Sequence, residues 1–131
     1  MHDQLHPAHW KRAAGSANGI AARGRMIFTG GLVGWDADQQ FRTDDFSGQV
    51  RQVLENIVAV LAEGGARPEH LVRLTWYVTD KQEYLAALDE VGAAYRDVIG
   101  RHFPAMALVQ VAALVEDRAR VEIEATAVVP D

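Results

Sequence analysis

The stretch Arg120–Val129, RVEIEATAVV, is the clearest strand signal in the sequence, because its side chains alternate between two chemical classes along the chain. The members of one set are apolar: Val121, Ile123, Ala125 and Ala127. The members of the other set are polar: Glu122, Glu124 and Thr126. Successive side chains of a β-strand point to opposite faces of its sheet, so this alternation predicts a strand with one apolar and one polar face. The stretch Leu71–Thr79, LVRLTWYVT, predicts a second strand of the same kind.

Two amphipathic helices are predicted beside these strands. From Phe46, apolar residues recur at helical spacing up to the glycine pair at 64–65, and Asp44 or Asp45 can cap the start. A second helix is predicted over residues 81–99, where apolar residues again form one stripe. Because each helix has a single apolar stripe, both are expected to pack on one face of the sheet.

Three further apolar runs complete the predicted order. Arg25–Gly30 and Ala105–Val115 are expected to be strands, and a weaker strand is expected near Ile20–Arg23. The order is then β-β-α-β-α-β-β, which is an α+β fold with two helices on one face of a sheet.

The face of the sheet opposite the helices is expected to be only partly polar. Its expected members are Thr75, Tyr77, Met106, Leu108, Glu122 and Thr126. A half-apolar face that no helix covers indicates burial against another subunit. The alternative is a two-layer monomer with a mildly apolar outer face.

Length and composition bound the possible functions. The 131 residues suit a single domain, residues 1–131, of which 1–14 are expected to form a loosely held arm. The formal net charge is −5, whereas binding to a phosphate backbone requires clustered Lys and Arg, so nucleic acid is not an expected partner. The chain has no cysteine, which excludes disulfides, thiolate catalysis and Cys-type zinc sites.

Targeting signals are not expected in this sequence. No segment has the long apolar run of a membrane helix, and the first ten residues, MHDQLHPAHW, lack the apolar core of a secretory signal. A cytoplasmic location without membrane contact is therefore the default expectation.

Metals and cofactors are also not expected. His2, His6 and His9 lie in the terminal arm without a helical pattern, whereas zinc requires a rigid set of three or four ligands. The segment at 30–34, GGLVG, is rich in glycine but has neither the G-x-G-x-x-G nor the G-K-S/T pattern of nucleotide sites. Its glycines either provide turn geometry or expose a backbone N–H to a ligand oxygen.

Glu122 and Glu124 are the strongest chemical feature, because Glu is depleted in strands. A partly buried carboxylate in a strand is a candidate general acid or base. The alternative is a solvated strand face on which Arg120 accompanies the two carboxylates.

Five segments, in this order along the chain, resemble the Rid (YjgF) family of reactive-intermediate deaminases. They are MIFTGG at 26–31, Q…LENI at 49–57, VRLTWYVTD at 72–80, FPA at 103–105 and VEIEA at 121–125. The resemblance covers about Gly15 to Val129. It implies a chorismate-mutase-like α+β fold and a homotrimer with sheets inward, helices outward and sites between subunits.

The resemblance also assigns site residues. A Glu on the last strand of the family positions the water that attacks an enamine or imine, and a glycine after the second strand adds a backbone group. These positions correspond to Glu122 and Gly31. Other substrate-binding positions lack the family's functional groups: Met106 replaces the carboxylate-binding Arg, Leu108 replaces a Ser or Cys, and Ser16 or Ala17 replaces an aromatic residue. Met cannot form the bidentate contact by which Arg binds a carboxylate, so the usual amino-acid-derived substrate is not expected.

Two functions follow from these observations. The first is hydrolytic release of ammonia from a non-standard enamine or imine, with Glu122 activating water. The second is a non-catalytic trimer that binds a small metabolite or a partner enzyme. A ribonuclease role, sometimes attached to this family, is disfavoured by the acidic charge.

Overall fold

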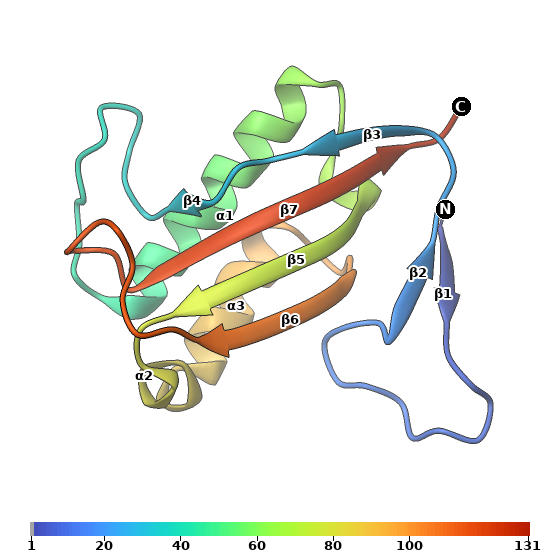
Figure 1. Cartoon of the computed structure of the whole chain (residues 1–131), viewed down its shortest axis with the longest axis horizontal. Helices are drawn as coiled ribbons and strands as arrows, with labels where there is room; N and C mark the ends of the chain where they lie inside the picture. The colour runs from blue at the N-terminus through green and yellow to red at the C-terminus, as the bar shows by residue number, and fades with distance from the viewer. Residues whose placement is uncertain (1) are drawn as a thin grey trace.

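One mixed sheet forms the centre of the computed structural model, which describes residues 2–131. Its strands are β3 (Arg25–Phe28), β4 (Leu32–Val33), β5 (Leu71–Val78), β6 (Ala105–Gln110) and β7 (Val121–Val129). The order is β3-β7-β5-β6, with β4 also paired to β7, and only β5 and β6 run parallel (Figure 1). The strand predicted from RVEIEATAVV therefore lies at the centre of the sheet, with neighbours on both sides.

The helices lie together behind the sheet in the view of Figure 1. They are α1 (Phe46–Glu63), α2 (Lys81–Ala86) and α3 (Leu88–Val98), with a short 3₁₀ turn, η1 (Pro68–His70), before β5. This arrangement confirms the α+β prediction with the helices on one face. No helix within residues 2–131 has the length and apolar character needed to cross a membrane.

The start of α1 follows the sequence prediction. Asp45 is the N-cap, and its carboxylate accepts a hydrogen bond from the Gly48 N–H at 2.9 Å. This bond and the one from the Ser47 hydroxyl lower the pKa of Asp45. Gly64 then ends the helix, as the glycine pair predicts.

The second predicted helix, 81–99, is divided at Ala87, so the prediction of one continuous helix is wrong. Ala87 has φ −116° and ψ 21°, which leaves the helical region and lets α3 begin in a new direction. Leu85 and Leu88 on the two sides of this break are 51% and 50% exposed. Of the apolar stripe read from the sequence, Val91, Tyr95 and Ile99 are buried, in α3 and directly after it.

The core lies between the helices and one face of the sheet. α1 contributes Val50, Val53, Leu54, Ile57 and Leu61, all fully buried. These residues face Leu74, Trp76 and Val78 of β5 and Val121, Ile123 and Ala125 of β7. The alternation predicted for both strands thus determines which face they bury.

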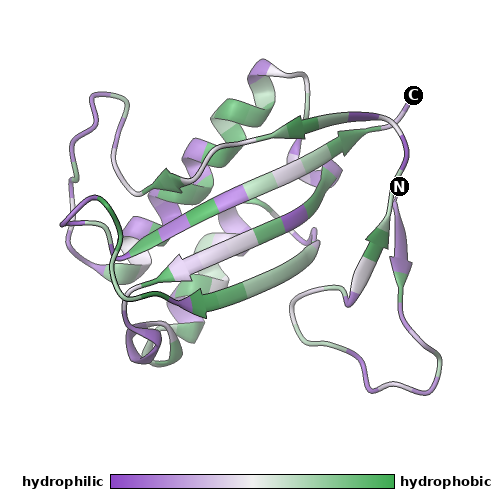
Figure 2. Cartoon of the chain, viewed as in Figure 1, coloured by the Kyte–Doolittle hydropathy of each residue, from purple (hydrophilic) through white to green (hydrophobic). Residues whose placement is uncertain are grey.

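β6 presents the opposite set of side chains to the one expected. It ends at Gln110 rather than Val115, and its parallel register places Met106 beside Leu74 and Leu108 beside Trp76. Neighbours in register point to the same face, so Met106 and Leu108 point toward the helices. Figure 2 shows why the prediction for β6 was wrong: successive residues of β6 are apolar on both faces, whereas apolar and polar residues alternate along β7.

The uncovered face of the sheet remains partly apolar after this correction. Phe28, paired with Thr126, and Val109, paired with Tyr77, are 64% and 45% exposed. Exposed apolar side chains next to carboxylates on an uncovered sheet are typical of an interaction surface.

The first residues contain a strand that the sequence analysis did not expect. β1 (Asp3–Leu5) pairs with β2 (Gly19–Ala21) as a separate two-stranded sheet, and the loop between them extends away from the body (Figure 1). The weak strand predicted near Ile20–Arg23 therefore begins earlier and is not part of the main sheet. The Ala17 N–H donates to the Pro104 carbonyl at 3.1 Å, so the returning strand meets the start of β6.

Candidate functional site

Glu122 and Gly31 are brought together at the uncovered face. β4 pairs with β7 so that Val33 lies opposite Glu122, and the loop before β4 runs along this strand. The Thr29 hydroxyl accepts a hydrogen bond from the Ala125 N–H at 2.9 Å, which holds the loop in place. A Cβ atom built on Gly31 would overlap the Glu122 carboxylate. Only a glycine therefore lets the carboxylate lie directly against the loop backbone.

The two carboxylates of β7 have different surroundings. The Tyr77 hydroxyl donates a hydrogen bond of 2.8 Å to Glu124 Oε1, and this bond is the main reason that the pKa of Tyr77 is raised. Arg120 does not accompany either carboxylate, because its guanidinium pairs with Glu83 at 2.7 Å. Within residues 2–131, no side chain donates a hydrogen bond to Glu122. Glu122 is half-buried and available for a ligand or water, whereas Glu124 is held by Tyr77.

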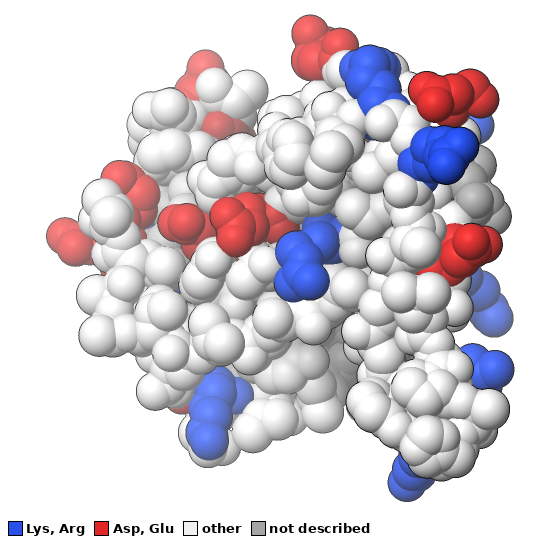
Figure 3. All heavy atoms as spheres, turned by 45° about the vertical axis from the view of Figure 1, so that its right-hand side comes forward, with Lys and Arg blue, Asp and Glu red and all other residues white. Residues whose placement is uncertain are grey.

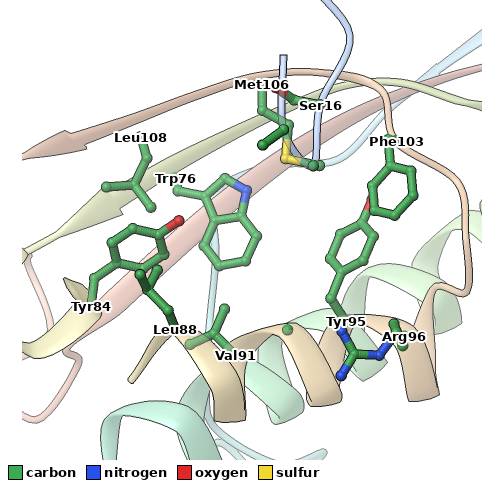
Figure 4. A pocket seen from close by; sticks show the side chains of 13 residues that line it. Ser16, Trp76, Tyr84, Leu88, Val91, Tyr95, Arg96, Phe103, Met106 and Leu108 are labelled. Carbon is green, nitrogen blue, oxygen red and sulfur yellow. The ribbon is translucent and has the colours of Figure 1, made fainter. Parts of the chain in front are cut away.

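Met106, Leu108 and Ser16 meet at a different place, a cavity of about 460 Å³ between β6, α3 and the segment before β2 (Figure 4). Four aromatic side chains form much of its wall: Trp76, Tyr84, Tyr95 and Phe103. Leu88 and Val91 add aliphatic surface from α3. The volume and the apolar lining are typical of a small-molecule site.

Tyr95 and Phe103 form a fixed wall of this cavity. Their rings stack with centroids 5.7 Å apart and an interplanar angle of 12°. The Tyr95 hydroxyl donates to the His102 carbonyl, and burial raises the pKa of Tyr95. The Tyr95 hydroxyl is therefore neutral, donates its proton to the His102 carbonyl, and does not act as a base.

Four other polar groups that line the cavity have no hydrogen-bond partner within residues 2–131: the Trp76 indole N–H, the Arg96 guanidinium and the hydroxyls of Ser16 and Tyr84. The Trp76 indole N–H is buried and has no acceptor among the described residues. Figure 4 shows it on the side of the ring turned toward Met106 and Ser16. Arg96, on the exposed rim, forms no ion pair within residues 2–131.

The five residues predicted for one site therefore form two groups within a chain. Glu122 and Gly31 lie on the uncovered face, and Met106, Leu108 and Ser16 lie on the side of the helices. Glu122 and Met106 were both expected on the uncovered face, but they lie on opposite faces of the sheet, because β6 points Met106 toward α3. Sequence reasoning missed the cavity residues Trp76, Tyr84, Tyr95, Arg96 and Phe103, whose only signal was aromatic residues near the two ends of the second helix.

Two of the three histidines in the arm contact backbone carbonyls. His2 Nε2 lies 3.0 Å from the Val128 carbonyl, and His6 Nε2 lies 2.9 Å from that of Trp10. In the described part of the chain, no three metal-binding side chains come together. On the face in Figure 3, basic side chains are interspersed with acidic ones and form no continuous basic surface.

A family model described as endoribonuclease L-PSP matches residues 11–129, nearly the whole chain. The chain belongs to the Rid family, also called YjgF. The 2-iminobutanoate/2-iminopropanoate deaminase of Salmonella typhimurium is 34% identical over 108 residues, which cover 80% of each chain. Protein DfrA of Myxococcus xanthus is 37% identical over 110 residues, covering 80% of this Rid chain and 77% of that protein.

Solved Rid structures have the same fold. The Rid protein YyfB of Yersinia pestis is 28% identical and superposes with a TM-score of 0.87 over 98% of both chains. A Mycobacterium tuberculosis member of the YjgF/YER057c/UK114 family is 30% identical, with a TM-score of 0.67 over 88% of this chain and 87% of that one. The fold predicted from the sequence motifs is thus confirmed.

Proposed function

We propose that this Rid chain hydrolyses a small enamine or imine and releases ammonia, with Glu122 as the catalytic residue. The observation that carries the proposal is the contact of the unpaired Glu122 carboxylate with the backbone at Gly31. A relative at 34% identity is named as a deaminase of 2-imino acids, which supports the reaction class.

The proposed chemistry requires only water and one carboxylate. Glu122 takes a proton from water, the oxygen attacks the C=N carbon, and the proton passes to the nitrogen. The resulting carbinolamine then transfers its hydroxyl proton through Glu122 to the amine, which leaves as ammonia while a ketone forms. An enamine must first be protonated on carbon to give the imine. The Gly31 N–H is the proposed hydrogen-bond donor to the carbinolamine oxygen as that oxygen loses its proton.

The complete site is proposed to form between subunits of a homotrimer. On one chain, the Glu122 group and the Met106 cavity lie on different sides of the sheet, and β6 is an edge strand. A neighbouring copy packed on the uncovered face can place its own cavity near Glu122. In this arrangement, Met106, Leu108 and Ser16 contact the substrate, which is expected to differ from that of family members with the carboxylate-binding Arg.

The test measures ammonia release from two enzymatically generated imines: a neutral aromatic imine that an amine oxidase forms from benzylamine, and the imino acid that an amino-acid oxidase forms from phenylalanine. Glu122→Gln is expected to lower the rate above the spontaneous background by about 100-fold or more, with an unchanged melting temperature. Glu55→Gln is the matched control, because Glu55 is exposed on α1. If Glu122→Gln released ammonia as fast as Glu55→Gln, the catalytic assignment would be wrong.

A non-catalytic binding function is the second candidate. It is favoured by the position of the aromatic cavity, which is complete within one chain and has no carboxylate in its wall. This function would be supported instead if the protein bound a small molecule in the aromatic cavity but released no ammonia from either imine.

A further inference from the structure

The polar groups of the aromatic cavity define what its ligand must carry. The Trp76 indole N–H and the Arg96 guanidinium are donors only, and neither has an acceptor in the described structure, whereas the hydroxyls of Ser16 and Tyr84 in the same lining can donate or accept. No Asp or Glu lines the cavity, so a cationic ligand would find no counter-charge there. A ligand that satisfies both donors must bring acceptors, and next to Arg96 it gains most from a negative charge.

The unpaired donor of Trp76 belongs to a buried side chain and not to a surface residue that water can reach. Its side chain is 4% exposed, and a buried indole N–H usually has a hydrogen-bond partner. A buried donor without an acceptor costs free energy that a ligand acceptor can recover. Met106 borders the same part of the cavity, and its flexible thioether can move to admit that acceptor.

Arg96 is placed at the rim by a glycine one turn earlier in α3. A Cβ atom on Gly92 would lie 3.3 Å from Arg96 Nη1, so the guanidinium folds back along the helix over Gly92. Both residues line the cavity. The absence of a side chain at Gly92 therefore leaves the guanidinium close to the cavity mouth.

We propose that Trp76 and Arg96 determine the specificity of this cavity and select a carboxylate with a bulky, ring-sized apolar body. The body packs against Met106, Leu108 and Trp76, an oxygen accepts the indole N–H, and the negative charge faces Arg96. A short imino acid cannot fill the cavity and reach Arg96 at once. As an account of the substrate this rests on the proposed function, but the binding itself does not require turnover.

The test is calorimetric titration of the full chain with phenylacetate, with its neutral amide, phenylacetamide, and with the cationic phenethylamine. The wild type is expected to bind phenylacetate about tenfold more tightly than the amide. Arg96→Gln removes this preference by weakening phenylacetate alone. Trp76→Phe keeps an aromatic ring but removes the donor, and weakens both ligands by about fivefold. Arg101→Gln is the matched control, because Arg101 is exposed and does not line the cavity, and it should change neither affinity.

Each opposite result overturns the inference. Equal wild-type affinity for the two ligands, unchanged phenylacetate binding by Arg96→Gln, or tighter binding of phenethylamine would exclude an anion-selective cavity. Melting temperatures confirm that the variants fold. These outcomes are separable from those at Glu122, because binding is measured without an imine. If Glu122→Gln lost turnover while Arg96→Gln bound phenylacetate as the wild type does, the proposed deaminase activity would stand and the proposed specificity of the cavity would be rejected.

Discussion

A substitution at Gly31 tests whether the reaction depends on the close approach of the loop backbone to the Glu122 carboxylate. In Gly31→Ala, the new methyl group takes the space of the Glu122 carboxylate, which must rotate away. Gly31 has no positive φ, so alanine fits the backbone and the free energy of unfolding should change by less than about 1 kcal/mol. A catalytic group displaced by about 1 Å loses roughly 100-fold in rate, so ammonia release should fall sharply.

Gly30→Ala is the control at the adjacent residue. A Cβ atom on Gly30 meets nothing within 4 Å, so this variant should retain activity. Equal rates of ammonia release from the two variants would show that the position of Glu122 beside Gly31 has no role in the reaction.

At the level of elements, the N-terminal part of α1 is tied to the segment before β7 by one buried amide. The fully buried Gln49 donates to the Thr43 and Arg118 carbonyls at 3.1 and 3.0 Å, and its oxygen accepts the Arg120 N–H at 2.8 Å. Gln49→Leu keeps the volume but removes these bonds. We expect a loss of about 2–4 kcal/mol in the free energy of unfolding, measured by urea denaturation.

The same substitution at an exposed position separates this effect from a general effect of leucine. Gln82 lies on the exposed surface of α2, and Gln82→Leu should change the free energy of unfolding by less than about 0.5 kcal/mol. A Gln49→Leu protein as stable as Gln82→Leu would show that the three bonds contribute nothing net.

The elements also show what sequence patterns can and cannot determine. β7 was placed correctly, with Glu122 and Glu124 on the uncovered face, because only one of its faces is apolar. β6 was assigned the wrong face, because Ala105, Ala107 and Val109 are as apolar as the alternate set, and only pairing with β5 decides between them. The cavity was missed for a related reason: it depends on how α3 packs beside β6, which spacing along the chain does not reveal.

At the level of the whole molecule, the uncovered sheet face predicts that chains associate, and the resemblance to the Rid family implies an assembly of three. Light scattering should give a mass near three times 14.4 kDa. The prediction combines the exposed apolar residues of this face with a proposed site whose two groups lie on different sides of one sheet. A mass that corresponds to one chain at every concentration would contradict both the trimer and a site shared between subunits.

Phe28 provides the decisive variant for this assembly. Its ring is 64% exposed in the single chain, so Phe28→Asp should leave the fold of a subunit intact. In a trimer the same residue is expected to lie at the interface, where an unpaired carboxylate would be buried at high cost. We therefore expect Phe28→Asp to elute as a monomer that melts cooperatively but releases no ammonia. Val115→Asp adds the same charge at a residue that is 93% exposed and away from the sheet face, and it should remain a trimer. A Phe28→Asp protein that remained trimeric and active would place the interface elsewhere, and Glu122 would then have to act within a single subunit.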